Sequence, residues 1–218
     1  MCAGPWAMWN DGGTLMGERL MADHIRSSTV AVGLPTVSAE VLMPSQSVCL
    51  DSPLGFLHLI TVDGYQLSEI QIRDSPPVAT ATTSTPCPVL HQSSEQLADY
   101  FAGRRQQFDL PLSPAGTPFQ QRVWQALQQI PFGVTASYQA IARAIGQPTA
   151  CRAVGGANGR NPLPIVIPCH RVIGARGALV GFSAGIDRKV WLLQHEAEFS
   201  PQLSAELARM PSPSAPGT

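Results

Sequence analysis

Apolar and polar positions along the first half of the chain predict a small sheet followed by a helix. Residues 55–72 contain two apolar runs separated by Asp63-Gly64, and Asp-Gly is a favoured two-residue turn, so the pattern predicts a β-hairpin. Residues 75–88 are rich in Pro, Thr and Ser, which predicts a loop. A short helix is then predicted over 94–101. These elements predict an αβ domain over residues 46–112.

Apolar residues in the second half recur at helical spacing. After a plausible linker at 112–116, Thr117 is a predicted N-cap, with Pro118 at the first helical position and Gln120 completing a capping box. From there apolar side chains recur every four residues, starting at Phe119, which gives the predicted helix one apolar face.

Two shorter helices are predicted next. Ser137 is a predicted N-cap for a helix over 138–145, and a further helix over 148–154 is predicted to end at Gly155-Gly156. Two short helices joined by a tight turn that contains glycine are typical of a helix-turn-helix. Such pairs are also common in protein cores, so the pattern alone does not predict DNA binding.

Both ends of the chain have little pattern. We therefore expect a flexible extension over 1–45, a C-terminal domain over 113–200 and a flexible tail over 201–218. No apolar run approaches the roughly 18 residues of a membrane span, and the N-terminus does not resemble a secretory signal. We expect no membrane association and a cytoplasmic location, or a nuclear one in a eukaryote.

Charge is distributed unevenly, although the net charge is only −1. Between Asp109 and Asp187 there is no Asp or Glu, and this segment carries six arginines. Such a basic segment is typical of a surface that binds phosphate. The alternative is a weakly charged domain whose arginines are solvated or paired elsewhere. The six are Arg122, Arg143, Arg152, Arg160, Arg171 and Arg176.

The predicted helix at 148–154 is unusually rich in small residues. Cys151, Ala153 and Gly155 are all small, and Arg152 is its one large polar side chain. Small residues let a helix approach another surface closely. From this composition alone, a helix packed against its own domain is a simpler interpretation than a helix that approaches DNA.

Cys169 is the strongest candidate for chemistry. It follows an apolar run that ends in Pro168, and it precedes His170 and Arg171, which are residue types that lower the pKa of a thiol. The alternative is an inert, buried cysteine. The five cysteines include no C-x-x-C pair, so they predict neither a disulfide framework nor a zinc site.

A base at His170 would need a partner to orient it. Asp187 is a predicted N-cap for a final helix, and Glu196 lies on the apolar face of that helix, where an ionised carboxylate needs a partner. Pairing with His170 would give a Cys–His–Glu set that activates a nucleophile. Pairing of Glu196 with Arg188 or with solvent remains open at this point.

The residues around Cys169 resemble a known family. Residues 161–172, Asn-Pro-Leu-Pro-Ile-Val-Ile-Pro-Cys-His-Arg-Val, are similar to the active-site signature of the O6-alkylguanine-DNA alkyltransferases, also called methylated-DNA–protein-cysteine methyltransferases. The similarity extends from 116–120 through Ser137-Tyr138 and 152–156 to His195-Glu196, and more loosely over 50–112. It implies a ribonuclease H-like αβ domain followed by a mostly helical, winged-helix-like domain with a helix-turn-helix.

The resemblance also implies roles for the site residues in repair by direct reversal. Cys169 would accept the alkyl group from guanine O6 irreversibly, so each molecule would act once. His170 would be its base through a water molecule, with Glu196 orienting the imidazole. Asn161 would brace the active-site turn, and Tyr138 would protonate the leaving guanine.

On the DNA side, the resemblance implies that a helix enters the minor groove and that the damaged nucleotide is flipped out. Arg152 would fill the gap, with Ala153 and Gly155 at the same surface. Ser183 would bond the O6 side of the base, and the carbonyls of Val172 and of the reactive cysteine would contact its exocyclic amine.

The implied partner is double-stranded DNA with O6-alkylguanine, and also O4-alkylthymine, bound by a monomer without cofactor or metal. The main alternative is a relative that only binds alkylguanine and recruits other repair, but such relatives replace the cysteine. A Cys–His hydrolase would need an oxyanion motif, which we do not find. The chain departs from the family pattern at Cys151, Phe182 and Ala184, and the last two are expected to alter the alkyl pocket.

Overall fold

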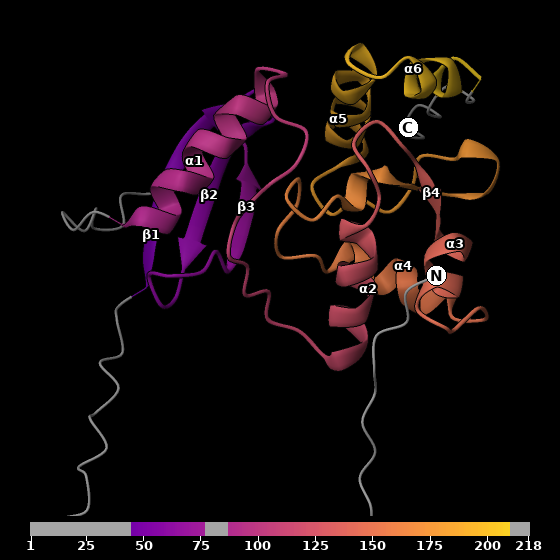
Figure 1. The fold of residues 1–218 in the computed structure, drawn as a ribbon, viewed down its shortest axis with the longest axis horizontal. Helices are drawn as coiled ribbons and strands as arrows, with labels where there is room; N and C mark the ends of the chain where they lie inside the picture. The colour runs from indigo at the N-terminus through magenta and orange to yellow at the C-terminus, as the bar shows by residue number, and fades with distance from the viewer. Residues whose placement is uncertain (1–44, 77–86, 210–218) are drawn as a thin grey trace, which may run out of the picture. The chain divides into compact units, whose positions relative to one another are not determined.

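The computed structural model describes residues 45–76 and 87–209, which belong to one compact unit (Figure 1). All but one residue of the predicted extension, most of the predicted loop at 75–88 and the last nine residues of the chain lie outside the described residues. The described part contains a small sheet with one helix, followed by a mostly helical region, as the sequence predicts.

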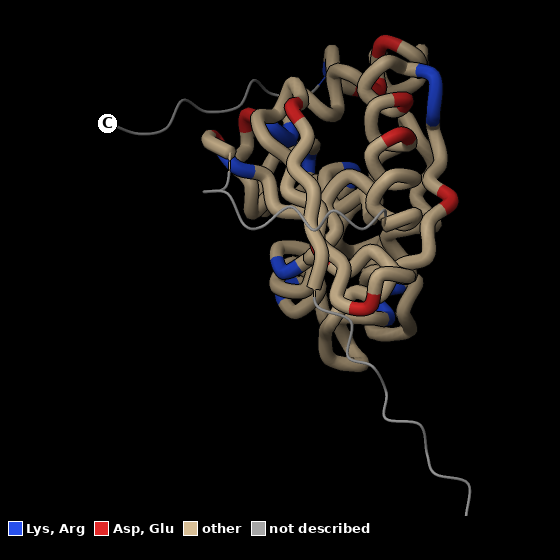
Figure 2. Tube along the Cα trace, turned by 90° about the vertical axis from the view of Figure 1, so that its left-hand side faces the viewer, with Lys and Arg blue, Asp and Glu red and all other residues tan. Residues whose placement is uncertain are grey.

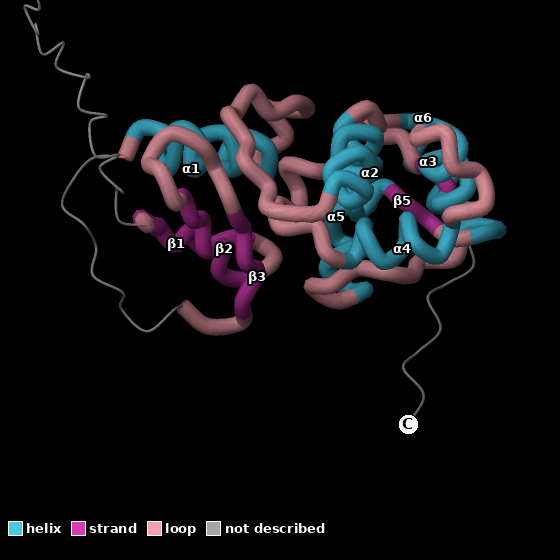
Figure 3. The backbone as a smooth tube through the Cα atoms, turned by 90° about the horizontal axis from the view of Figure 1, so that it is seen from below, coloured by secondary structure: helices cyan, strands magenta, loops and turns pink. Residues whose placement is uncertain are grey.

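The sheet has three antiparallel strands in the order β1-β2-β3. β2 (Gly55–Thr61) and β3 (Glu69–Arg73) form the predicted hairpin, and β1 (Gln46–Ser52) adds a strand that was not predicted. Helix α1 (Pro88–Phe101) covers one face of this sheet (Figures 1 and 3). Leucines of the central strand and of α1 form the local core.

Helix α1 begins at Pro88, six residues before the predicted start at Ser94. Proline fits the first helical position because its missing N–H has no partner there. Val89 and Leu90 are buried with Leu97, so the apolar face continues into this first turn. The earlier start was missed because Cys87, at the N-cap, makes no capping hydrogen bond.

Two predicted helix starts are confirmed by their caps. Helix α2 (Pro118–Gln128) has the complete capping box, in which the backbone N–H of Thr117 donates to the side chain of Gln120 at 2.8 Å. Helix α3 (Tyr138–Ala144) is capped by the side chain of Ser137.

Helix α4 (Cys151–Gly159) differs from its prediction, because it starts later and continues through Gly155-Gly156. Neither glycine adopts a positive φ, so both stay helical. Packing outweighs the low helix propensity of glycine, since Val154 and Ala157 are buried and the indole of Trp124 donates to the carbonyl of Ala157 at 2.9 Å.

The remaining elements surround the segment that contains Cys169. β4 (Ala136–Ser137) pairs in parallel with β5 (Val172–Ile173), and this pairing joins the start of α3 to that segment. Helix α5 (Ile186–Glu198) starts one residue before Asp187, so Gly185 is the N-cap and the prediction for Asp187 is wrong. The φ of Gly185 is +101°, which favours glycine.

Part of the predicted flexible tail is a helix. Helix α6 (Pro201–Leu207) packs on α5, with Ser200 as its N-cap and Leu203 buried. The short apolar pattern of 201–207 gave little indication of this packing, so the prediction is wrong for these residues. Within the described ranges, no helix has both the length and the apolar character needed to cross a bilayer.

Candidate active site

Cys169 lies in the interior, at the start of a 3₁₀ turn over Cys169–Arg171 that leads directly into β5. Only 2% of the residue is exposed. Its backbone N–H donates to the carbonyl of Ile167 at 2.8 Å, which tightens the chain just before the turn. The thiol is therefore held on a rigid, buried backbone.

Asn161 holds the turn that precedes Cys169. Its side-chain amide donates to the carbonyl of Ile167 at 2.8 Å, and its side-chain oxygen accepts from the N–H of Leu163 at 3.0 Å. Between them Ile165 has φ of +76°, a left-handed conformation that is strained for a β-branched residue. The two hydrogen bonds close the turn around this strained residue, as a brace would.

The structure brings His170 and Glu196 together. Nε2 of His170 lies 2.8 Å from Oε1 of Glu196, and neither side chain is exposed to solvent. The two alternatives for Glu196 are wrong, because the carboxylate is buried and because Arg188 pairs with Asp74 instead.

Glu196 is the centre of a larger buried network. Its carboxylate accepts from the hydroxyl of Tyr100 at 3.0 Å and from the backbone N–H of Gly133 at 2.9 Å. Arg171 donates to it through Nε at 3.0 Å and Nη2 at 2.9 Å. Although burial opposes ionisation, His170 and Arg171 hold the pKa of this carboxyl well below its usual range. The carboxylate is therefore ionised at neutral pH.

His170 has one ring nitrogen available as a base. Burial is the largest influence on its pKa and lowers it below the usual value, so the imidazole is neutral at pH 7. Because an ionised carboxylate only accepts, Nε2 carries the proton that is shared with Glu196. Nδ1 then has a lone pair, and this buried atom has no partner in the part of the chain that the structure describes.

The thiol itself is not activated in the resting protein. Burial raises the pKa of Cys169 to about 11, although a hydrogen bond from Asn161 and the charge of Lys189 act in the opposite direction. The expectation that His170 and Arg171 lower this pKa is wrong. His170 is uncharged, and the charge of Arg171 is balanced by Glu196. The thiol therefore keeps its proton at neutral pH.

Lys189 is a buried residue that the sequence reasoning missed. Its ammonium group donates to the carbonyls of Val172 and Val180 at 2.5 and 2.7 Å, and burial lowers its pKa to about 8. It is the sole lysine of the chain. Its position seven residues before Glu196, on the same apolar helix face, was the signal that could have revealed it.

Asn158 was also missed, and it links α4 to the cysteine. Its side-chain amide donates to the carbonyl of Gly181 at 3.2 Å and to that of Cys169 at 3.4 Å. Its Oδ1 is buried and has no partner among the described residues. No spacing in the sequence distinguishes this asparagine from a helix-end residue.

Tyr138 lies between α4 and residues 181–185, which the resemblance implies are at the alkyl pocket and which we call the pocket loop. Its hydroxyl donates to the carbonyl of Val180 at 3.1 Å, and a Cβ placed on Gly181 would lie 2.4 Å from that hydroxyl. Ser183 is exposed on the loop, and Phe182 is buried. Burial raises the pKa of Tyr138, as would a negative charge on Cys169, so its hydroxyl keeps its proton at neutral pH.

The two carbonyls expected to contact the base already have donors. That of Val172 accepts from Lys189, and that of Cys169 accepts from Asn158. A carbonyl oxygen has two lone pairs, so that of Val172 has one further position for a hydrogen bond, whereas that of Cys169 also accepts from the backbone N–H of Val172.

Helix α4 presents two different faces. Val154, Ala157 and Asn158 are packed inside, whereas Arg152 and Ala153 are exposed and Gly155 is half-buried beside the ring of Tyr138. Packing against its own domain is therefore confirmed for one face of α4, and an approach to DNA by the exposed face stays a prediction.

Between Asp109 and Asp187, the segment without acidic residues, five of the six arginines are exposed and Arg171 is buried. Acidic residues come before and after this segment in the sequence, and acidic and basic residues are both present along the described trace (Figure 2). Burial of Arg171 leaves a smaller basic surface than the sequence count implies.

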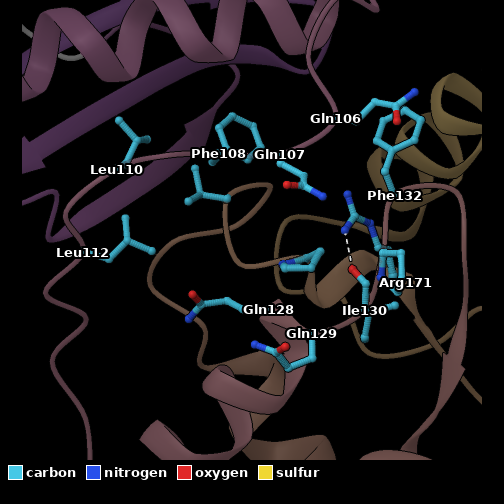
Figure 4. A pocket seen from close by; sticks show the side chains of 13 residues that line it. Gln106, Gln107, Phe108, Leu110, Leu112, Gln128, Gln129, Ile130, Phe132 and Arg171 are labelled. Atoms are coloured by element: carbon cyan, nitrogen blue, oxygen red, sulfur yellow. Dashed lines mark hydrogen bonds between the residues drawn. The ribbon is translucent and has the colours of Figure 1, made fainter.

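A cavity of about 390 Å³ reaches Pro168 and Arg171, on either side of Cys169 in the sequence, but Cys169 itself does not line it (Figure 4). Phe108, Gln128 and Phe132 line it, together with Arg171, whose Nη1 donates to the carbonyl of Ile130 at 2.7 Å. None of the predicted site residues lines this cavity. Across the described ranges, no cluster of three His, Cys, Asp or Glu residues could hold a metal ion.

Comparisons with known proteins find a matching family and similar sequences. Residues 118–198 match the family described as 6-O-methylguanine DNA methyltransferase, DNA binding domain. The chain is 49% identical over 154 residues to the methylated-DNA–protein-cysteine methyltransferase of Mycolicibacterium paratuberculosis, covering 70% of this chain and 92% of that protein. It is 56% identical over 110 residues to the constitutive one of Bacillus subtilis, covering 50% and 67%.

Solved structures are similar as well. The crystal structure of Mycobacterium tuberculosis O6-methylguanine methyltransferase matches with a TM-score of 0.62 and 43% identity, over 78% of this chain and 96% of that one. A structure of the Mycobacterium tuberculosis protein in complex with DNA matches with a TM-score of 0.62 and 44% identity, over 75% and 98%.

Proposed function

The chain belongs to the methylated-DNA–protein-cysteine methyltransferase family, and from that membership we propose how its own residues carry out the reaction. It is an enzyme of DNA repair that reverses alkylation directly by transferring the alkyl group from DNA to a cysteine of its own. We assign this cysteine to Cys169. The observation that carries the assignment is the buried contact between His170 and Glu196, one residue after the thiol.

The geometry supports a proton transfer that accompanies substrate binding. Nδ1 of His170 accepts the thiol proton of Cys169 through a water molecule, and the negative charge of Glu196 stabilises the imidazolium that results. The thiolate attacks the alkyl carbon, the bond between that carbon and O6 breaks, and the electron pair passes to guanine. Tyr138, which keeps its proton at neutral pH, protonates the guanine ring nitrogen.

The thioether that forms is stable, so no step regenerates the thiol. Each protein molecule therefore acts once. This property follows from the chemistry of direct displacement and needs neither a metal nor a cofactor.

DNA binding is assigned to the exposed face of α4. Helices α3 and α4 act as a helix-turn-helix whose second helix enters the minor groove, where the small side chain of Ala153 and the absence of one at Gly155 permit close approach. Arg152 fills the space left by the flipped nucleotide, and flipping costs a few kcal/mol. Ser183 then contacts the O6 side of the base, and the carbonyls of Cys169 and Val172 accept hydrogen bonds from its exocyclic amine.

Further properties are proposed from family membership. The chain has an N-terminal domain over 46–112 with a ribonuclease H-like arrangement and a winged-helix-like domain over 113–200. It acts as a monomer in the cytoplasm, or in the nucleus of a eukaryote, where a free thiol stays reduced. The substrates are O6-alkylguanine and O4-alkylthymine in double-stranded DNA. A role limited to binding is not favoured, because the chain retains Cys169.

The proposal is tested with duplex DNA that carries radiolabelled O6-methylguanine. Label is expected on the peptide that contains Cys169, and Cys169→Ala should abolish transfer. Cys151→Ala is the matched control, since Cys151 is a half-buried cysteine of α4 and should not accept label. Transfer that survives in Cys169→Ala, or no transfer by the wild-type protein, would contradict the assignment.

A further inference from the structure

Arg188 connects the N-terminal sheet to the loop beside the cysteine. Its Nε donates to the carbonyl of Leu54, in the turn between β1 and β2, at 2.8 Å. Its Nη1 donates to the carbonyl of Ala184, in the pocket loop, at 2.9 Å. Its Nη2 pairs with Asp74, just after β3. One guanidinium group therefore spans three segments that are far apart in the sequence.

The turn at Leu54 is shaped to receive this guanidinium. Gly55 has φ of +98°, and a Cβ placed there would lie 2.5 Å from the carbonyl oxygen of Arg73 and 3.6 Å from Nη2 of Arg188. A side chain at this position would disturb the turn next to the guanidinium. The turn and the arginine therefore form one fitted contact.

The pocket loop is held by two consecutive residues of α5. Lys189 holds the carbonyl of Val180, just before the loop, and Arg188 holds that of Ala184 near its end. Phe182 and Ser183 lie between these two anchors. Lys189 bonds only to carbonyls of the C-terminal region, whereas Arg188 also bonds to the N-terminal sheet and so fixes the loop to it.

The hydrogen bonds from Arg188 to the two backbone carbonyls hold the loop more strongly than the ion pair with Asp74 does. Asp74 is 94% exposed, and exposed ion pairs contribute little because solvent screens them. The side chain of Arg188 is only 22% exposed, so its bonds to Leu54 and Ala184 are better protected from water. A guanidinium is planar and rigid, and lysine lacks the fork needed to reach both carbonyls with the same geometry.

We infer that Arg188 is a positioning residue for alkyl transfer, which fixes the end of the pocket loop to the N-terminal sheet and thereby limits the size of alkyl group that the pocket accepts. The inference rests on the proposed function of the Cys169 site. It also gives the N-terminal sheet a role in substrate choice, although no residue of the sheet is among those proposed to act on the substrate.

The consequence is a change in selectivity. Without Arg188 the loop is free to move near Ala184, so a small methyl group is positioned less well against Cys169. A displacement of about 1 Å can reduce a rate up to about a hundredfold. A bulky benzyl group needs a wider pocket and loses less. The ratio of benzyl to methyl transfer should therefore rise.

The experiment compares transfer from O6-methylguanine and O6-benzylguanine, both in the same duplex. For Arg188→Ala we expect the methyl rate constant to fall about tenfold and the benzyl rate constant to fall less. Arg188→Lys should lie between this variant and the wild type. Asp74→Asn should stay within about twofold of the wild type, because it removes only the exposed ion pair.

Arg104→Ala is the matched control, since Arg104 pairs with Asp99 at 2.8 Å on the surface of α1 and does not touch the loop. Hydrogen exchange at the amide of Gly185, which donates to the carbonyl of Phe182, should accelerate in Arg188→Ala and not in the control.

Three outcomes would overturn the inference. The first is an unchanged benzyl-to-methyl ratio in both Arg188 variants. The second is an effect of Asp74→Asn equal to that of Arg188→Ala, which would assign the effect to charge. The third is unchanged exchange in the loop. A wild-type protein that transfers neither group would instead contradict the proposed function, so the two failures are distinguishable.

Discussion

The side chains that surround Cys169 and those proposed to meet DNA differ in almost every physical respect. His170 and Glu196 are fully buried and hydrogen-bonded to each other. Arg152 is exposed on α4, and among the described residues it makes no hydrogen bond or ion pair. The buried group is organised before any substrate arrives, which reduces the cost of reorganisation during reaction. The exposed group is left without partners, so its interactions are available to DNA.

Substitutions in these two groups should therefore reduce activity in two different ways. Changes in the buried group should affect every substrate together with the free energy of unfolding. Changes on the exposed face should affect only substrates in duplex DNA. The predictions below test this separation.

The largest expected effect concerns the ionisation of Cys169 without DNA. Burial raises the pKa of Cys169 to about 11, which is about four units above pH 7. Only roughly one molecule in ten thousand therefore carries a thiolate at pH 7. Alkylation of Cys169 by iodoacetamide should be very slow at pH 7 and should rise with pH towards about 11. Peptide mass spectrometry over a pH series measures it, with Cys151 as internal reference. Rapid alkylation at pH 7 would show a thiolate in the resting protein.

Glu196→Gln should affect both stability and chemistry. The variant leaves the buried charge of Arg171 without its counter-ion, and breaking a buried pair in this way costs about 3–5 kcal/mol of unfolding free energy. Transfer from duplex DNA and from free O6-benzylguanine should fall by the same factor. Chemical denaturation and the two rate constants measure these effects. A loss confined to duplex DNA would show that Glu196 acts in DNA binding and not in the buried group around Cys169.

Arg152→Ala should produce the opposite pattern. Flipping costs a few kcal/mol, so losing the side chain that fills the gap should slow repair of duplex DNA by roughly tenfold. Reaction with free O6-benzylguanine and thermal stability should not change. Arg122→Ala, at an exposed arginine of α2, serves as the control. Equal losses on both substrates would contradict the role of Arg152 in flipping.

Arg143→Ala should have the smallest effect. Arg143 is exposed near the end of α3, and an arginine that contacts phosphate contributes about one unit to the salt dependence of binding. Binding of undamaged duplex at several salt concentrations measures this slope. An unchanged slope would exclude Arg143 from the DNA interface, and a change in the free-base reaction would link it to the buried group.

Local signals in the sequence predicted much of this structure. The caps at Thr117 and Ser137 are confirmed because the side chains that make them lie within three residues of the N–H groups that they bind. The contact between His170 and Glu196 was predicted because a carboxylate on an apolar helix face needs a partner.

Properties that depend on tertiary packing were not predictable. The continuation of α4 through Gly155-Gly156 depends on contacts with α2, including the hydrogen bond from Trp124 to the carbonyl of Ala157. The pKa of Cys169 was predicted in the wrong direction, because the sequence does not show that Arg171 is paired with Glu196. Sequence similarity indicated the chemistry of the site, whereas burial decided the resting state of the thiol.

The most direct test of the central claim counts methyl groups. Wild-type protein is incubated with a large excess of duplex DNA containing O6-methylguanine, and intact mass and peptide mass are followed to completion. We expect a plateau at one methyl group per protein molecule, located on Cys169, with no repair afterwards. Repair that continues beyond one equivalent, or a methyl group on another residue, would contradict it.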